Sequence, residues 1–393
     1  MVRDWKPRTR AVHVGSRRSQ YGELSEAIFL TQGFMYDNAE LAEARFIEAK
    51  SDEFIYARYG NPTVAMFEDR IAGLEGSEDA FATASGMAAV SGVLMAMLKQ
   101  GDHVVSSRAL FGSCLYVLDE ILPRFGVDVT FVDGLSLEQW SNAIGSRTKA
   151  VFCESMSNPT LEVIDIAEVS RRAKAVGAQL IVDNVFSTPV FSCALQAGAD
   201  VVIYSSTKHI DGQGRALGGV ILSTKEFIRK TVEPYMKHTG GSMSPFTAWI
   251  MLKGLETLDL RVNAQADTAF ALSEVLHEHD KVVNLIYPGH PTHPQYDLIR
   301  YQMRKGGTVL SVEIEGGQAG AFRFMNGLRI AKISNNLGDA KTIVTHPSTT
   351  THQRLSQQQR DHLGISPGLV RISIGLEDCG DLISDILNAL KHV

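Results

Sequence analysis

The chain has 393 residues, of which 44% are hydrophobic and 21% charged, and 38 Lys and Arg against 44 Asp and Glu give a net charge of −6. This composition is typical of a globular protein and excludes a disordered or fibrous chain. The mild acidity argues against nucleic-acid binding, which usually needs a basic surface, and against electrostatic attraction to a membrane. At about 150 residues per domain, the length predicts two or three domains.

The cysteines and the apolar segments indicate the cellular compartment of the protein. Cys114, Cys153, Cys193 and Cys379 form no CxxC pair, which is typical of buried thiols in a reducing compartment. The basic N-terminal segment lacks the apolar core of a signal peptide. Residues 80–98 carry no charge, but serines and glycines interrupt them, so a strand, a tight turn and a buried helix fit better than a membrane span. We therefore expect a soluble cytoplasmic protein.

The first two thirds of the chain change from an irregular segment to alternating strands and helices. Residues 1–60 show little periodicity and are expected to form an arm with short helices. Alternating strands and helices predict a mostly parallel sheet covered on both faces, with one helix over 166–177. The strands are expected where short β-branched runs occur, at 103–107, 128–132, 150–153, 179–183, 200–204 and 219–223.

The pattern changes after about residue 250. A long helical stretch is expected from Ala248 to about His279, and strands at 307–315 and 369–375 enclose a further helix around 318–327. These elements predict a smaller α+β domain. The expected divisions of the chain are an arm at 1–60, a large domain at 61–255 and a C-terminal domain at 256–393.

Candidate ligand-binding residues follow the predicted strands, because ligands of open α/β sheets bind at the carboxyl ends of the strands. Ser85 and Gly86 follow the strand near residue 80 and open a helix, whose free N–H groups suit a phosphate. Asn158 follows the strand at 150–153, and the proline after it favours an extended conformation. Taken singly, each feature also fits an ordinary turn or loop.

The next two strand ends carry opposite charges. Asp183 ends an apolar strand, where a carboxylate is costly to bury without a donor or cation. Lys208 follows the strand at 200–204 among hydroxyl side chains, and a buried lysine has a lowered pKa and becomes nucleophilic. Pyridoxal phosphate (PLP) needs such a set: a lysine for its aldehyde, a carboxylate for its ring nitrogen, and N–H and hydroxyl donors for its phosphate.

Five motifs resemble the Cys/Met-metabolism family of fold-type I PLP-dependent enzymes, and the resemblance extends over essentially the whole chain. The family includes cystathionine γ-synthase, cystathionine lyases, methionine γ-lyase and homoserine-ester sulfhydrylases. The resemblance implies PLP as cofactor and an α/β fold with a large mostly parallel sheet domain and a smaller C-terminal α+β domain. The motifs are YARYGNPT at 56–63, SGMA at 85–88, SNP at 157–159, SSTK at 205–208 and VRISIG at 370–375.

The resemblance also implies a role for each matching residue. Lys208 would bind the cofactor aldehyde covalently, and Asp183 would pair with the ring nitrogen and keep it protonated. Arg371, with Ser334 nearby, would bind the substrate α-carboxylate, because a bidentate guanidinium suits a planar carboxylate. The remaining cofactor contacts would come from Ser85, Gly86, Met87, Ser205 and Thr207 around the phosphate and from Asn158 at the 3′-oxygen of the ring.

Three aromatic and basic positions bear on assembly and on the reaction. By resemblance, Tyr56 and Arg58 would reach the cofactor phosphate or the substrate of a neighbouring subunit. This implies a homo-oligomer, typically a tetramer of two catalytic dimers. Phe111 falls where many members place a tyrosine that stacks on the cofactor ring. Phenylalanine can still stack, but proton transfer would pass to Tyr56, Lys208 or water, which weakens the lyase interpretations.

Segments after the lysine resemble the O-succinylhomoserine sulfhydrylase branch of the family. They are HIDGQGR at 209–215, NLGDAK at 336–341, and the stretch at 346–352 that contains two histidines. The branch implies PLP-dependent γ-replacement on O-succinyl-L-homoserine by sulfide, which gives L-homocysteine and succinate in methionine biosynthesis. His346 and His352 fit loop or core positions better than a metal site, so no metal is expected.

Several alternatives stay open at this level. Within the family they are cystathionine γ-synthase, methionine or cystathionine γ-lyase, and O-acetylhomoserine as the ester; neither the acyl group nor the thiol donor is fixed by the sequence. A dinucleotide-binding oxidoreductase is much less favoured. The GxGxxG fingerprint is absent, since the glycine-rich stretch at 212–218 is one residue too long and follows a lysine.

Overall fold

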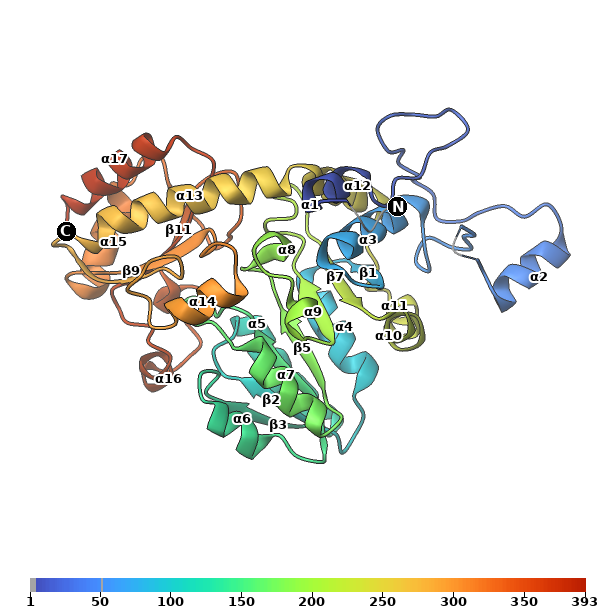
Figure 1. Cartoon of the computed structure of the whole chain (residues 1–393), viewed down its shortest axis with the longest axis horizontal. Helices are drawn as coiled ribbons and strands as arrows, with labels where there is room; N and C mark the ends of the chain where they lie inside the picture. The colour runs from blue at the N-terminus through green and yellow to red at the C-terminus, as the bar shows by residue number, and fades with distance from the viewer. Residues whose placement is uncertain (1–4, 51) are drawn as a thin grey trace.

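A seven-stranded sheet forms the centre of the large domain (Figure 1). The structure is a computed structural model that describes residues 5–50 and 52–393, so the first four residues of the predicted arm lie outside it. Strand β7 runs antiparallel to both of its neighbours, and the other strands are parallel. The spatial order is β1 (Asp79–Thr83), β7 (Gly219–Ser223), β6 (Val201–Tyr204), β5 (Gln179–Asp183), β4 (Thr148–Glu154), β2 (His103–Ser107) and β3 (Asp128–Val132).

Helices cover both faces of this sheet, as the sequence predicts. Along β4, Ala150 and Phe152 belong to one buried cluster, whereas Val151 and Cys153 belong to another. Side chains alternate between the faces of a strand, so the two clusters are the two faces of the sheet. The described α-helices are α1 (Pro7–His13), α2 (Ala39–Ile47), α3 (Pro62–Glu75), α4 (Gly86–Met97), α5 (Gly112–Tyr116), α6 (Leu137–Ala143), α7 (Ile166–Ala175), α8 (Thr188–Phe191), α9 (Ala194–Ala197), α10 (Lys225–Phe227), α11 (Glu233–Thr239), α12 (Pro245–Glu256), α13 (Leu258–His277), α14 (Tyr296–Gln302), α15 (Gly317–Gly327), α16 (Gln357–His362) and α17 (Cys379–Leu390).

The uncharged stretch at 80–98 forms a strand, a turn and a helix, as expected. Strand β1 and helix α4 are joined at Ser85, whose side chain caps the helix by accepting a hydrogen bond from Ala88 N–H. Both elements contribute to the buried clusters of the sheet. In the part of the chain that the structure describes, no helix combines the length and the apolar character that a membrane crossing needs.

The helical stretch expected from Ala248 to about His279 is present but divided, because the segment forms α12 and α13 with a break at Thr257. Threonine is a weak helix former, and here it leaves helical geometry. The break lets Arg261 donate hydrogen bonds to the carbonyl oxygens of Gly254 and His209. Through the bond to His209, Arg261 therefore holds the loop that follows Lys208.

A second, five-stranded sheet lies in the C-terminal part of the chain. Helices α13, α15 and α17 share one buried cluster with it, and β10 and β11 pair in parallel while the other pairs are antiparallel. The division into domains at residues 60 and 255 stays a prediction. The order of this sheet is β10 (Lys332–Ile333), β11 (Ile343–Thr345), β12 (Leu369–Ser373), β9 (Val309–Ile314) and β8 (Val282–Ile286).

The N-terminal segment forms the predicted arm with short helices and extends away from the body of the molecule (Figure 1). It is fixed at Glu26, whose carboxylate pairs with buried Arg70 at 2.8 Å and with Lys253 at 3.0 Å. By contrast, α2 buries no residue. Large apolar side chains along the arm are exposed, including those of Tyr21, Leu24, Leu30, Met35, Phe46 and Ile47.

Candidate active site

A cavity of about 240 Å³ lies at the carboxyl ends of β4, β5 and β6, where the two sheets approach each other. This is the place at which open α/β sheets bind their ligands. Ten of the residues singled out from the sequence line it: Ser85, Gly86, Met87, Phe111, Asn158, Asp183, Ser205, Thr207, Lys208 and Arg371. The structure therefore brings together strand ends that are far apart in the sequence.

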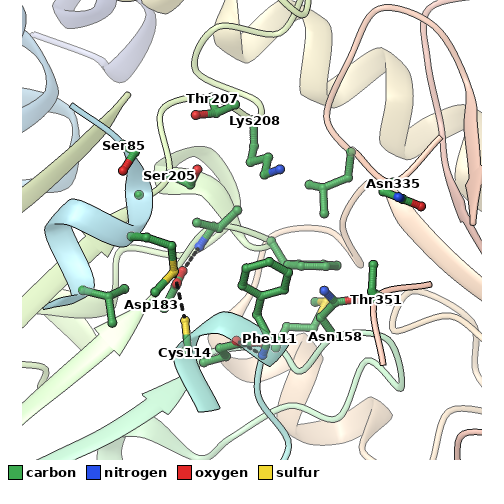
Figure 2. A pocket seen from close by; sticks show the side chains of 18 of the residues that line it. Ser85, Phe111, Cys114, Asn158, Asp183, Ser205, Thr207, Lys208, Asn335 and Thr351 are labelled. Carbon is green, nitrogen blue, oxygen red and sulfur yellow. Dashed lines mark hydrogen bonds between the residues drawn. The ribbon is translucent and has the colours of Figure 1, made fainter. Parts of the chain in front are cut away.

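One side of the cavity is suited to a phosphate. In Figure 2, Ser85, Ser205 and Thr207 lie on this side, opposite Asn158, Asn335 and Thr351. Gly86 and Met87 begin α4, so their N–H groups lack partners within the helix. A Cβ atom on Gly86 would come within 2.6 Å of the Ser205 side chain, so only glycine permits this close approach.

The Lys208 amine points into the cavity (Figure 2), and it donates a hydrogen bond to Asn336 Oδ1. Burial lowers the pKa of Lys208 to about 8, and the positive charge of Arg371 adds to this effect, while Asp183 opposes it. A lowered pKa increases the fraction of neutral amine, which is the nucleophilic form. This is the property that covalent capture of an aldehyde requires.

Asp183 ends β5 and lines the cavity, where its Oδ1 accepts a hydrogen bond from Val185 N–H at 3.1 Å. Burial raises the pKa of Asp183 to about 6, against the opposing effects of that hydrogen bond and of Lys208. A cationic group in the cavity would relieve this cost by stabilising the carboxylate. A protonated ring nitrogen supplies such a charge.

Arg371 on β12 is buried, being 2% exposed, but its described hydrogen-bond partners are all neutral. Its Nη1 donates to Asn158 Oδ1 at 2.8 Å, and Nη2 donates to Asn336 O and Thr345 Oγ1. Burial lowers the pKa of Arg371 to about 10. A buried guanidinium is costly without an anion, so the geometry favours an anionic ligand beside it.

Phe111 and Asn158 lie close together across the cavity from the phosphate side (Figure 2). The Phe111 ring is 37% exposed and faces the open space of the site. Because Asn158 Oδ1 accepts from Arg371, the NH₂ end of the Asn158 amide is the end that can donate to a ligand. Both residues can therefore contact a flat ring, by stacking and by a hydrogen bond.

Three predicted site residues do not belong to the described wall of the cavity. Arg58 donates a hydrogen bond to Lys237 O, and its guanidinium lies over the rings of Tyr56 and Tyr59. Ser334 is exposed, and its carbonyl oxygen accepts a hydrogen bond from Thr345. The roles of Tyr56, Arg58 and Ser334 stay predictions.

Other residues that line or contact the cavity were not predicted from the sequence. Asn335 and Leu337 line it from the loop between β10 and β11, and Asn336 of the same loop holds Lys208. The asparagine pair at 335–336, whose second member begins the NLGDAK motif, was the available signal. The other missed lining residues are Val90, Cys114, Glu154, Met156, Val185, Phe186, Leu217 and Thr351.

His346 and His352 are buried, and both ring nitrogens of His346 have partners: Nδ1 lies 2.8 Å from Thr349 Oγ1 and Nε2 lies 2.8 Å from Pro367 O. His352 contacts the Thr351 hydroxyl. Within residues 5–50 and 52–393, no group of three or more His, Cys, Asp or Glu side chains is arranged to hold a metal ion.

Comparison with known proteins decides the family. The sequence pattern described as "Cys/Met metabolism PLP-dependent enzyme" matches residues 8–391. This chain belongs to that family. Membership confirms the fold class that the sequence predicted, and it means that the chain is an enzyme that acts on small molecules.

Similar proteins of known function cover nearly the whole chain. O-succinylhomoserine sulfhydrylase of Mycobacterium tuberculosis is 49% identical over 98% of this chain and 95% of its own length. The enzyme of the same name from Pseudomonas aeruginosa is 44% identical over 97% of this chain and 94% of its own length. L-methionine γ-lyase of Fusobacterium nucleatum subsp. polymorphum is 36% identical, with 98% of each chain covered.

A solved structure confirms the cofactor of the family. A Campylobacter jejuni protein, provisionally described as O-acetylhomoserine (thiol)-lyase, superposes with a TM-score of 0.94 and 28% identity over 98% of this chain and 100% of its own. It carries an N′-pyridoxyl-lysine-5′-monophosphate. The cavity fits this group, since its donor set combines a lysine amine, a carboxylate and a helix N-terminus. The cofactor of this chain is therefore PLP.

The lowered pKa of Lys208 predicts how fast the apoenzyme takes up PLP at different pH values. The neutral amine is the reactive form, so the uptake rate should rise with pH and level off above the Lys208 pKa of about 8. Stopped-flow absorbance of apoenzyme mixed with PLP measures this profile. A rate that continues to rise towards pH 10.5, the ordinary lysine pKa, would contradict the assigned environment.

Proposed function

We propose that this chain catalyses PLP-dependent γ-replacement on O-succinyl-L-homoserine, in which sulfide replaces the succinyl group to give L-homocysteine and succinate. One structural observation carries the proposal: Lys208, Asp183 and Arg371, three charged side chains with perturbed pKa values, converge on one cavity. The similar proteins that are 49% and 44% identical are both O-succinylhomoserine sulfhydrylases. This agrees with the branch that the sequence motifs predicted.

The protein holds the cofactor and the proton-transfer groups in fixed positions. Bound PLP supplies an electron sink that acidifies the substrate α- and β-carbons and lets the γ-substituent leave. Lys208 binds the cofactor and, once its amine is free, removes the proton at Cα and moves protons at Cβ as general base and acid. Asn336 orients that amine through its Oδ1 atom. Asp183 keeps the ring nitrogen protonated.

The substrate is oriented at the opposite side of the cavity. Arg371 binds the α-carboxylate of the substrate, which supplies the anion that its neutral partners do not. The hydrogen bonds from Arg371 to Asn158 and Asn336 hold the guanidinium in the plane that this contact requires. Ser334 is connected to this site through Thr345, whose hydroxyl donates to Ser334 O and accepts from Arg371 Nη2, and this places it near the same carboxylate.

Phe111 favours replacement over elimination. Its ring lines the cavity but carries no hydroxyl, so it cannot act as the proton donor that the lyase interpretations invoke. The similar L-methionine γ-lyase is also less identical, at 36%. Cystathionine γ-synthase, the γ-lyases and use of O-acetylhomoserine remain the alternatives that the experiment below distinguishes.

Product analysis with the purified holoenzyme tests the function. O-succinyl- and O-acetylhomoserine are each incubated with sulfide, with cysteine or without a thiol, and products are identified by mass spectrometry. Of all the combinations of ester and thiol, the succinyl ester with sulfide should react fastest, and its products should be homocysteine and succinate. Preferred formation of cystathionine from cysteine would assign γ-synthase activity instead, and release of α-keto acid and ammonia without thiol would assign a γ-lyase.

We propose further that the working enzyme is a cytoplasmic homotetramer of two catalytic dimers, in which Tyr56 and Arg58 complete the site of the neighbouring subunit. Two observations support an interface with a shared site. Neither residue lines the described cavity of its own chain. The arm also exposes large apolar side chains, such as Leu24 at 90% and Met35 at 94%, and surfaces of this kind mark protein interfaces.

Mixing two inactive variants tests the shared site. If Lys208 and Arg58 of one site come from different subunits, a hybrid of Lys208→Ala and Arg58→Ala subunits contains one intact site. Random dimers should then recover about a quarter of the wild-type activity, since half of the dimers are hybrids and half of their sites are intact. Mixing Lys208→Ala with Arg371→Ala is the control and should recover nothing. Equal failure in both mixtures, with hybrids verified by native mass spectrometry, would reject the shared site.

A further inference from the structure

Glu154 lines the cavity, but it has no role in the proposed reaction. It is the last residue of β4 and pairs in register with Asp183 at the end of β5. Paired residues of neighbouring strands present their side chains on the same face of a sheet. Both carboxyl groups line the cavity, and Glu154 is only 5% exposed.

The contacts of Glu154 differ at its two oxygens. Oε1 accepts a hydrogen bond from Phe111 N–H at 2.5 Å. Oε2 is buried and has no hydrogen-bond partner among the described residues. A buried carboxylate oxygen without a donor or cation is costly. The bond from Phe111 N–H also ties Phe111, which lines the cavity, to the end of β4.

Two adjacent buried carboxyl groups cannot both carry a negative charge at low cost. Asp183 is the one that is favoured as the anion, because Val185 N–H and the Lys208 charge stabilise it. Burial raises the pKa of Glu154 well above its usual range, and the charge of Asp183 raises it further, while main-chain N–H groups of Phe111 and Asn158 oppose the shift.

The other titratable groups around Glu154 leave this division of charge unchanged. Cys114 on α5 and Cys153 on β4 are buried, and burial raises the pKa of both thiols, so they are neutral. Lys208 and Arg371 line the same cavity. Lys208 acts on Asp183, and neither cation is among the groups that shift the pKa of Glu154.

We propose that Glu154 is a positioning residue: its neutral carboxyl group fixes the main chain of Phe111 in the cavity wall and leaves Asp183 as the single negative charge at this wall. The inference rests on the proposed function only in that the cavity holds PLP. Phe111 has no hydroxyl with which to anchor itself, so the position of its ring depends on its main chain. Because Glu154 is neutral, the charge that acts on the ring nitrogen from this wall is that of the Asp183 carboxylate.

Three variants of the full-length protein test the proposal. Glu154→Gln keeps the acceptor and the neutral charge, and Glu154→Ala removes both oxygens. Glu68→Gln is the matched control, because Glu68 also accepts one main-chain hydrogen bond, from Ala82 N–H at 2.7 Å, but does not line the cavity. The readouts are the PLP dissociation constant of the apoenzyme and the pH midpoint of the absorbance of bound PLP.

The glutamine variant should retain the wild-type pH midpoint and bind PLP within about threefold of wild type. The alanine variant should weaken PLP binding by about tenfold, which corresponds to one lost hydrogen bond. If the alanine variant does not fold, Glu154→Met, of similar length, takes its place. A pH midpoint displaced by about one unit or more in Glu154→Gln, but not in Glu68→Gln, would show that Glu154 is charged and overturn the proposal.

Wild-type binding and an unchanged midpoint in Glu154→Ala would equally overturn it, because Glu154 would then position nothing. Infrared spectra of apoenzyme give an independent readout: Glu154→Gln should remove one protonated-carboxyl band that Glu68→Gln leaves in place, and its persistence would contradict a neutral Glu154. These measurements need no homoserine ester. Their failure and failure of the proposed reaction are therefore distinguishable.

Discussion

Lys208→Ala is expected to abolish the reaction, with a fall in kcat of at least about 10³-fold. A single positioned acid or base contributes roughly 10²- to 10⁴-fold, and Lys208 both binds the cofactor and moves the substrate protons. The amine is already poised for this by burial, which lowers its pKa to about 8. Homocysteine formation from O-succinylhomoserine and sulfide, at saturating PLP, measures the loss.

Two further variants separate the role of the amine from the role of its charge. Lys208→Arg keeps a positive charge beside Asp183 but lacks a nucleophilic amine, so it should be as inactive as the alanine variant. Lys341→Ala changes an exposed lysine paired with Asp339 and should retain wild-type kcat. Substantial turnover by either Lys208 variant would contradict the assigned chemistry.

Arg371→Ala is expected to raise the KM for the homoserine ester by roughly 10²- to 10³-fold, because loss of a buried charged partner typically costs about 2–5 kcal/mol. Arg371 is 2% exposed and its described partners are all neutral, so the substrate carboxylate is the anion that completes its environment. Steady-state kinetics with the ester varied at fixed sulfide measure the change.

The conservative variant shows whether the effect is specific. Arg371→Lys keeps a positive charge but loses the planar pair of donors, so its KM should lie between those of wild type and Arg371→Ala. The KM for sulfide and the affinity for PLP should change little in Arg371→Lys. If the ester KM stays at the wild-type value in both variants, Arg371 does not bind the substrate carboxylate.

Much of the large domain and of the cavity wall could be predicted because the relevant signals are local. Short β-branched runs predicted the parallel strands, and the residues that end or follow them, such as Asp183 and Lys208, meet at one edge for purely geometric reasons. Ser85 and Gly86 were recognisable because a helix N-terminus has a compositional pattern.

The residues that were missed depend on register and on tertiary contacts. The predicted strand at 150–153 ends one residue early, and the observed β4 includes Glu154, which places this carboxyl group beside Asp183. Asn336 lies in a loop of the C-terminal sheet and reaches Lys208, 128 positions earlier in the sequence. No periodicity encodes such a contact.

The break between α12 and α13 shows a different limit of the sequence. The sequence predicts a long helical stretch here but gives no sign that it divides into two helices at Thr257. The break becomes understandable only from the fold, in which Arg261 reaches carbonyl oxygens of the loop after Lys208. The roles of Tyr56 and Arg58 are harder still to predict, because the site that they are proposed to complete belongs to another copy of the chain.

Borohydride trapping of the holoenzyme, followed by peptide mass spectrometry, identifies the lysine that binds the cofactor. Reduction should attach the pyridoxyl phosphate group permanently to one lysine, and we expect this lysine to be Lys208. The Lys208→Ala protein should carry no such adduct after the same treatment. An adduct on any other lysine, or none in a holoenzyme that makes homocysteine, would contradict the assignment of this cavity as the active site.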